Sequence, residues 1–373
     1  MSKIKKDIET ALDGLNLFSN REQYLQSYPV YLGTDVEVLV RNDRKGGWLW
    51  PHEHGMAQHR PERVSGDEYD WHADGFAHEL CTSPSTCIEE VSIFVARGLC
   101  HLAQNYGAGT QYFAPVMYQV PKQVLKNAPS EVRQLGCSPS LNVYGDAGNP
   151  SALPDDRRTT GCHLHLSHPI LLKEHGLQVA EDLVKWADIL VGNTWIYIAP
   201  KSSLRLERKR RLAYGRAGEF RLQTYPVYPK GRVHKDYEKG VEYRVLPGTV
   251  ITHPSYFSMM FNLYRKALRL AALIGTPPDE FTNTARLAIN EADRDQAELL
   301  IEELPWTFTS RSLLDSLADR PFRSVKASTW LNRAKQRSLH MRESKRISQL
   351  DEPNPNNSGV GYYGYASPSP FLR

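Results

Sequence analysis

The sequence predicts an α+β protein in which a mainly antiparallel sheet carries helices on one face. Strand-like segments dominate the first two thirds of the 373 residues, and helical segments dominate the last third. No Gly-x-Gly-x-x-Gly motif follows a predicted strand, and the chain has no P-loop. Because these two motifs mark the common nucleotide-binding folds, any nucleotide must bind here on another architecture.

The first 105 residues predict the start of the sheet. Residues 31–41 (YLGTDVEVLVR) are rich in β-branched residues and carry acids at alternate positions, as a strand does. Residues 42–69 are rich in Gly, His and charge, which predicts a long loop, and residues 73–82 (ADGFAHELCT) predict a second strand. Residues 86–105 place apolar side chains at helical spacing, so we expect a helix packed on the sheet.

Three more strands and a helical region are predicted in the rest of the chain. Residues 159–167 (TTGCHLHLS) alternate as a strand does, and residues 168–199 predict one long helix. Residues 218–224 and 240–246 are strand-like, and from Pro254 the pattern is helical to about residue 346.

The composition argues against nucleic-acid-binding, membrane-spanning and secreted proteins. The chain has 46 Lys and Arg against 42 Asp and Glu, a net charge of +4 that is too small by itself to argue for nucleic acid. No apolar run reaches the roughly 20 residues of a membrane-spanning helix, and the first residues lack the apolar core of a signal peptide. We therefore expect a cytoplasmic protein with no membrane or nucleic-acid partner.

The cysteines point to reduced thiols. There are five, an odd number, and no Cys-x-x-Cys pair occurs. This pattern argues against a disulfide scaffold and against a zinc ribbon.

Polar pairs in the predicted strands indicate a chemically active sheet face. Three strands each carry two polar residues at positions i and i+2, which project from one face: Asp35 and Glu37, His163 and His165, and Glu242 and Arg244. Asp74 and Glu79 have an odd spacing and share that face only if Gly75 bends or bulges the strand. Uncompensated buried charges would cost several kcal/mol each, so water or cations must cover this face.

The ligand types favour a hard divalent cation. Carboxylates with one or two imidazoles suit Mg²⁺ or Mn²⁺, whereas zinc prefers thiolates or three imidazoles. An arginine-rich stretch could supply countercharge to phosphate, since guanidinium groups match phosphate geometry: Arg205, Arg208, Arg210, Arg211 and Arg216. Together these features indicate phosphoryl transfer from a magnesium nucleotide by positioning and charge neutralisation.

The residues alone leave other interpretations open. Each polar pair could lie on a solvated sheet face, and Glu242 with Arg244 could be a surface ion pair. A metal-dependent hydrolase could use His163 and His165 with a carboxylate. A structural or nucleic-acid-binding protein could instead use the arginine-rich stretch and the basic residues 333–346.

The serial order of the motifs resembles a known superfamily. The motifs are GTDVEV, DGFAHEL followed by TSP, GCSPSLN, GCHLHLS, YGRAGEFR and GVEYRVLP, within residues 31–250. In this order they resemble the glutamine synthetase and glutamate–cysteine ligase superfamily, and within it the COOH–NH2 ligase (amidoligase) group of bacteriophages. The resemblance implies a sheet curved into a half-barrel, with helices on its outer face and the site inside the curve.

The resemblance also implies roles for individual residues. The implied metal ligands are Asp35, Glu37, Asp74, Glu79, His163 and Glu242. The implied nucleotide contacts are His163, His165, Arg216, Arg221 and Arg244, and of these Arg244 and Arg216 are also implied to act in catalysis. The first motif departs from the commoner Glu-x-Glu because Asp35 replaces its first glutamate.

The implied activity is an ATP- and magnesium-dependent carboxylate–amine ligase that forms an amide through an acyl phosphate, with Mn²⁺ as an alternative ion. Its partners would be small-molecule or peptide carboxylates and amines, in the host cytoplasm if a phage encodes the chain. Residues 1–30 would precede a catalytic α+β domain at 31–250, and 251–346 would be a helical part of the same domain. Residues 347–373, rich in Pro, Asn, Gly and Tyr, are expected to be a disordered tail.

Overall fold

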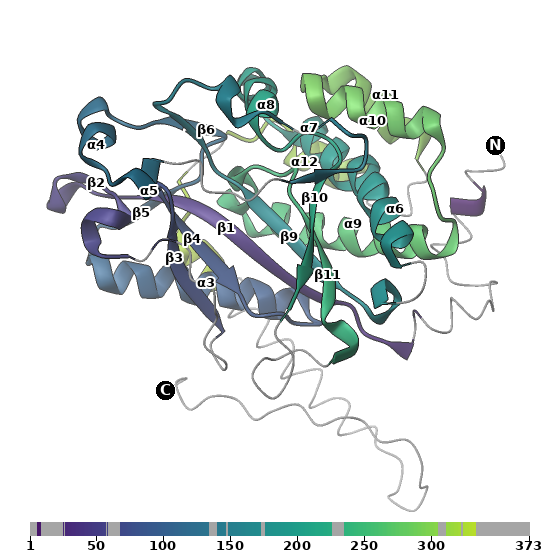
Figure 1. Ribbon diagram of the computed structural model, residues 1–373, viewed down its shortest axis with the longest axis horizontal. Coiled ribbons are helices and arrows are strands. Elements are labelled where there is room, and N and C mark those ends of the chain that lie inside the picture. The colour runs from purple at the N-terminus through teal and green to yellow at the C-terminus, as the bar shows by residue number, and fades with distance from the viewer. Residues whose placement is uncertain are drawn as a thin grey trace, which may run out of the picture. The chain divides into compact units, whose positions relative to one another are not determined.

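An antiparallel sheet with helices behind it forms the centre of the computed structural model (Figure 1). The structure describes residues 6–8, 25, 27–56, 58, 68–133, 140–146, 148–172, 176–225, 235–304, 311–321 and 324–332. All of them belong to one compact unit, Met1–Ala334. The predicted tail at 347–373 and the basic stretch at 333–346 lie outside the described residues. None of the described helices is long and apolar enough to span a membrane.

Within the described residues, nine strands form the main sheet and every pair of neighbouring strands is antiparallel. Seven strands lie in the order β3 (Tyr69–Asp74), β4 (Ala77–Thr82), β1 (Tyr31–Asn42), β9 (Cys162–Ser167), β11 (Lys239–Tyr243), β10 (Glu219–Thr224) and β7 (Leu141–Asn142). Two short strands, β2 (Gly47–Leu49) and β5 (Gln111–Phe113), extend the far end of β1. The order is open at β3 and β7, so these strands form no closed barrel.

Helices cover one face of the sheet. Figure 1 shows α3 (Ile88–Tyr106) and α9 (Pro254–Leu273) behind the strands, and α6 (Gly176–Ala187) packs against α9. Further helices are α7 (Asn193–Ile198), which is buried throughout, α8 (Lys201–Ala213), α10 (Asp279–Glu291), α11 (Arg294–Glu303) and α12 (Arg311–Leu317). The α+β class, with its mainly antiparallel sheet and helices, is therefore confirmed.

The strands alternate as the sequence predicts. Val36, Leu164 and Tyr243 point into the main hydrophobic core beneath the helices. Their neighbours along each strand therefore project from the opposite face, which we call the polar face. The prediction that residues at positions i and i+2 share one face of the sheet is therefore confirmed for the polar pairs.

A second, smaller apolar cluster closes one end of the polar face. Leu39 follows Asp35 and Glu37 on that face of β1, and it packs with Phe76, Val120 and Val132. Val120 and Val132 belong to a separate layer made of β6 (Met117–Gln119), β8 (Arg157–Thr159), α4 (Lys122–Asn127) and α5 (Ser130–Arg133), together with its flanking loops. This layer shields the acids of β1 from solvent on that side.

Three predicted elements differ from the structure. The strand predicted at 73–82 is a hairpin, because Gly75 adopts a left-handed φ of 57° between β3 and β4. The helix predicted at 168–199 begins with a short 3-10 turn, Pro169–Leu172, and continues as α6 and α7 joined by a π-helical turn, Asp188–Gly192. The predicted loop at 42–69 contains β2 and short 3-10 turns in its described part.

Candidate active site

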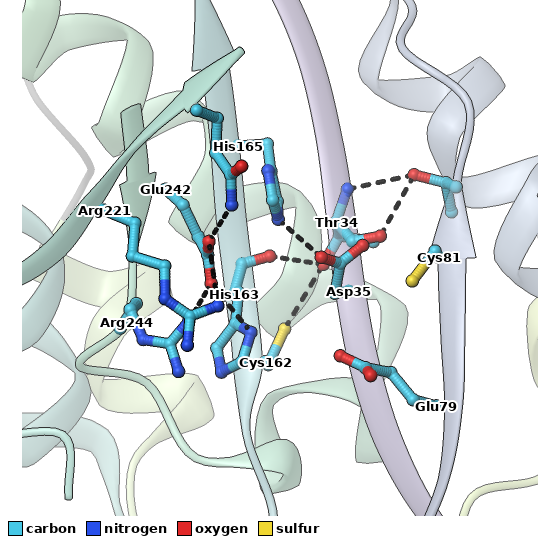
Figure 2. Close-up of polar contacts among 12 residues, drawn as sticks. Thr34, Asp35, Glu79, Cys81, Cys162, His163, His165, Arg221, Glu242 and Arg244 are labelled. Atoms are coloured by element: carbon cyan, nitrogen blue, oxygen red, sulfur yellow. Dashed lines mark hydrogen bonds and ion pairs between the residues drawn. The ribbon is translucent and has the colours of Figure 1, made fainter. Parts of the chain in front are cut away.

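The register of the sheet brings side chains that are distant in sequence together on the polar face. Residues directly opposite one another on neighbouring antiparallel strands share a face. Three rows cross this face: His72, Glu79 and Glu37; Cys81, Asp35 and His163; and His165, Glu242 and Arg221. Figure 2 shows part of this arrangement across β4, β1, β9 and β11. The predicted ligands of β1, β4, β9 and β11 therefore lie on one surface.

Two buried glutamates face each other on the part of the polar face formed by β3, β4 and β1, which we call the acidic side. Glu37 and Glu79 are directly opposite in the sheet, and each is only 7% exposed. Burial raises the pKa of both carboxyls, and the neighbouring charge of Asp74 raises it further. Glu37 Oε2 accepts a hydrogen bond of 2.9 Å from the backbone N–H of Gly161. Among the described residues, no lysine or arginine forms an ion pair with either glutamate.

The β3–β4 hairpin brings two more polar groups to these acids. Asp74 ends β3, two residues after His72 and on the same face, so the hairpin achieves what a bulge was expected to do. His72 Nε2 lies 2.6 Å from Glu79 Oε2. Burial alone would lower the pKa of His72, but the hydrogen bond and charge of Glu79 outweigh it and raise that pKa.

The two histidines of β9 make separate contacts. His163 Nδ1 lies 3.2 Å from Glu242 Oε1, and its Nε2 lies 2.7 Å from the Tyr214 hydroxyl. Burial, helped by the charge of Arg244, lowers the pKa of His163 to about 3. His163 is therefore a neutral imidazole that donates from Nδ1 to the carboxylate and accepts at Nε2 from tyrosine.

His165 connects the acidic side to a tyrosine. Its Nε2 lies 2.9 Å from Asp35 Oδ2, and its Nδ1 lies 2.9 Å from the Tyr225 hydroxyl. A small cavity opens beside this ring, lined by Gly33, Thr82 and Tyr225 among others. Because Gly33 has no side chain, the sheet leaves room here next to His165.

Glu242 is surrounded by donors. Its carboxylate pairs with Arg244, accepts from Gln223 and lies 3.9 Å from Arg221 Nη1. Burial alone would raise the pKa of Glu242, but Arg244 and the two histidines outweigh it and hold that pKa below its usual value. Arg244 is fully buried, and its guanidinium lies 5.1 Å from the Tyr214 ring centroid. In this structure Arg244 holds Glu242, while Arg221 is a quarter exposed at the border of the site.

Most of the arginine-rich stretch lies on helix α8, which directs its arginines to different sides. Arg210 and Arg211 are buried and donate to the backbone carbonyl of Val245, and Arg211 also pairs with Glu207 at 3.2 Å. The prediction that these two arginines offer countercharge to phosphate is therefore wrong, because they secure the chain that follows β11.

The other arginines of the stretch lie away from the acids of β1. Arg205 and Arg208 are exposed on α8, and Arg208 pairs with Glu291 at 2.6 Å. Arg216 pairs with Asp146, beyond β7 at the edge of the sheet.

The donors fit a hard divalent cation. Asp35, Glu79 and His163 each offer a ligand atom within 4.8 Å of the others, and Glu37 faces Glu79 from β1. Oxygen ligands with one imidazole suit Mg²⁺ or Mn²⁺. A cation there would also offset the repulsion between the buried glutamates. Glu242, predicted as a ligand, is instead occupied by arginine and glutamine contacts.

Sequence reasoning missed four residues of the site: His72, Cys81, Tyr214 and Tyr225. A signal for His72 was present, because Asp70, His72 and Asp74 alternate as strand residues do. Cys81 lies two residues after Glu79 and so shares its face. Tyr214 directly follows α8 and begins the YGRAGEFR motif. Tyr225 directly follows β10, and no local pattern indicates it.

Comparison with known proteins gives limited matches. No family model matches the chain, and no curated protein matches it. Among solved structures it is similar to a bifunctional glutathione synthetase from Pasteurella multocida, at 12% identity and a TM-score of 0.41, over 92% of this chain and 50% of that one. It is also similar to a structure described as apo GmaS without ligand, at 12% identity and a TM-score of 0.32, over 93% of this chain and 76% of that one. The chain thus spans about half the length of the glutathione synthetase, and the resemblance to the phage amidoligases stays a prediction.

Proposed function

We propose that this chain is an ATP- and magnesium-dependent ligase that joins a carboxylate to an amine. The observation that carries the proposal is the pair of buried glutamates, Glu37 and Glu79, directly opposite each other and without a lysine or arginine ion-pair partner among the described residues. Such a pair is costly in an empty protein and becomes favourable when a cation binds.

The charges across the polar face suit a magnesium triphosphate. Acids gather on β3, β4 and β1, neutral His163 lies in the middle, and Arg221 lies on β10. Asp35, Glu79 and His163 would hold the metal with Glu37, and the bound ion would neutralise charge on the phosphates. We expect the exposed part of the Arg221 guanidinium to contact a phosphate oxygen.

The reaction follows from these groups without a protein nucleophile. A substrate carboxylate attacks the γ-phosphorus of ATP, ADP leaves, and an acyl phosphate results. An amine then attacks the acyl carbon, phosphate leaves, and one proton passes to solvent. The apolar cluster around Phe76 and Leu39 keeps water from one end of the face, which protects an acyl phosphate from hydrolysis. The small cavity beside His165 and Gly33 offers space for a substrate group.

The alternatives receive less support. A two-histidine hydrolase needs both imidazoles on one ion. Among the described residues, no candidate metal group contains both His163 and His165. A nucleic-acid-binding protein would need the arginine-rich stretch as an open surface, but Arg210 and Arg211 are buried.

Thermal unfolding with Mg²⁺ and ATP tests the proposal. A ligand that binds the folded state raises stability by RT ln(1 + [L]/Kd), so Mg-ATP at about 100 times its Kd adds about 2.7 kcal/mol. Glu37→Gln should abolish this gain, whereas Glu131→Gln, an exposed acid on α5, should keep it. ADP release with pooled acids and amines, followed by product mass, then identifies the substrates. Absence of any gain with Mg-ATP in the wild type would contradict the ligase proposal.

A further inference from the structure

We propose that His72, Glu79 and Cys81 form a second metal site, one that binds a transition ion such as Zn²⁺ or Co²⁺ through a thiolate. The site lies on the β3–β4 hairpin at the border of the polar face. It goes beyond the proposed ligase function, because it requires neither nucleotide nor activity.

The hairpin builds this site through its register. His72 is directly opposite Glu79, and Cys81 follows Glu79 by two residues, so all three side chains leave the same face of two neighbouring strands. One ligand atom from each lies within 4.8 Å of the others. Since register and not a flexible loop sets these positions, the three groups are held together before any ion binds.

The distance between the sulfur and one ring nitrogen is close to that in a tetrahedral site. Cys81 Sγ lies 3.9 Å from His72 Nδ1. With metal–sulfur and metal–nitrogen bonds of about 2.3 and 2.05 Å, the two atoms would be about 3.6 Å apart in a tetrahedral site. A movement of a few tenths of an ångström would bring these two atoms to that distance. Glu79 Oε2 contacts the other ring nitrogen, Nε2, at 2.6 Å, so the carboxylate would have to turn toward Cys81 to bind the same ion.

The donor types separate this group from the magnesium ligands. Sulfur and imidazole select zinc-like ions, whereas Mg²⁺ is bound mainly by oxygen. All three residues are buried, with Cys81 6% and His72 8% exposed, and Cys81 is a thiol. On binding, the sulfur–metal bond forms and the thiol proton leaves to solvent.

Glu79 belongs to both groups of ligands. It stands with Asp35 and His163 in one candidate group and with His72 and Cys81 in the other. A carboxylate has two oxygens, so Glu79 can bridge two ions or serve one at the expense of the other. The soft ion would therefore lie beside the magnesium position.

Cobalt absorption tests the site on the full-length protein. Titration of the wild type with Co²⁺ should give an ultraviolet thiolate-to-cobalt charge-transfer band and the strong visible bands of a tetrahedral ion. Cys81→Ser should lose the charge-transfer band, whereas Cys100→Ser, a matched change on α3, should keep it. Absence of the band in the wild type, or its persistence in Cys81→Ser, would overturn the proposal.

Zinc affinity supplies a second measurement. Competition with a chromophoric chelator should show Zn²⁺ binding weakened about 100-fold in Cys81→Ser and at least 10-fold in His72→Gln. Circular dichroism of each variant shows whether it is folded, so a loss of binding in a folded variant supports the site. Equal zinc affinity in the wild type and both folded variants would refute it. Neither experiment contains ATP, so failure of the ligase proposal leaves both results interpretable.

Discussion

Replacing Glu37 by glutamine should make the ligand-free protein more stable. Glu37 is buried opposite Glu79, and residues so placed have Cβ atoms about 5 Å apart. Two unit charges about 6 Å apart at an effective dielectric constant of 20 repel by about 3 kcal/mol. One carboxyl can take up a proton to relieve part of this, so we expect a gain of about 1–3 kcal/mol.

Glutamine is chosen because it removes the charge of Glu37 and keeps the other interactions of the side chain. Its side-chain oxygen can still accept the hydrogen bond from the Gly161 N–H, and its volume matches that of glutamate. Urea unfolding in buffer with a chelator measures the free energy of unfolding, with Glu131→Gln as the exposed control. The control should change the value by less than about 0.5 kcal/mol.

The combination of two results is diagnostic. If Glu37 is a metal ligand, the neutral variant should have a higher free energy of unfolding than the wild type when no ligand is present. The same variant should no longer be stabilised by Mg-ATP. A structural ion-pair partner would instead lower stability when neutralised. If Glu37→Gln lowers the free energy of unfolding by more than about 1 kcal/mol, the reasoning about an unbalanced acidic pair is refuted.

Four further outcomes are expected. Arg244→Gln leaves Glu242 buried without its arginine and should lower the free energy of unfolding by about 3–5 kcal/mol in urea titrations. Burial raises the pKa of Asp188 to about 7, so its ionisation opposes folding: wild-type stability should fall between about pH 4 and pH 7, and Asp188→Asn should flatten this slope in urea midpoints. Gly33→Ala adds a methyl 3.7–3.8 Å from its nearest neighbours and should reduce ADP release with substrates while leaving the Mg-ATP thermal shift intact. Zn²⁺ should reduce that shift in the wild type but less in Cys81→Ser, as parallel melts would show.

The polar face could be predicted because a strand has a period of two. Asp35 with Glu37 and His163 with His165 needed only the correct strand assignment, and the structure supplied it. Which strands are neighbours is set by long-range pairing, which no local pattern contains. The serial order of the motifs predicted that the polar pairs belong to one site. It did not predict the contact between His165 and Asp35, which depends on β9 lying beside β1.

Two failures have definite physical causes. Gly75 was compatible with a bulge or a turn, and the turn prevailed because residues 69–72 extend as a strand and pair with residues 79–82. The arginine-rich stretch was interpreted as an open phosphate site, but a helix directs its residues to different sides. Glu207 and Arg211, four residues apart, form an ion pair of the kind expected within a helix, and that spacing indicated a structural role.

The order of charges across the sheet also restricts how a magnesium triphosphate can lie. The acids of β3, β4 and β1 are on one side, and Glu242 on β11 is already balanced by Arg244 and Gln223. A metal ion therefore gains most near Glu37 and Glu79, where charge is least balanced, and phosphate oxygens gain most toward Arg221 on β10. Since His163 is neutral and lies between these regions, its Nε2 could turn from the Tyr214 hydroxyl to the ion without adding charge. The triphosphate is thus expected to cross the strands from β1 toward β10, which leaves the cavity beside Gly33 and His165 for the substrate that receives the phosphoryl group or the amine that follows it.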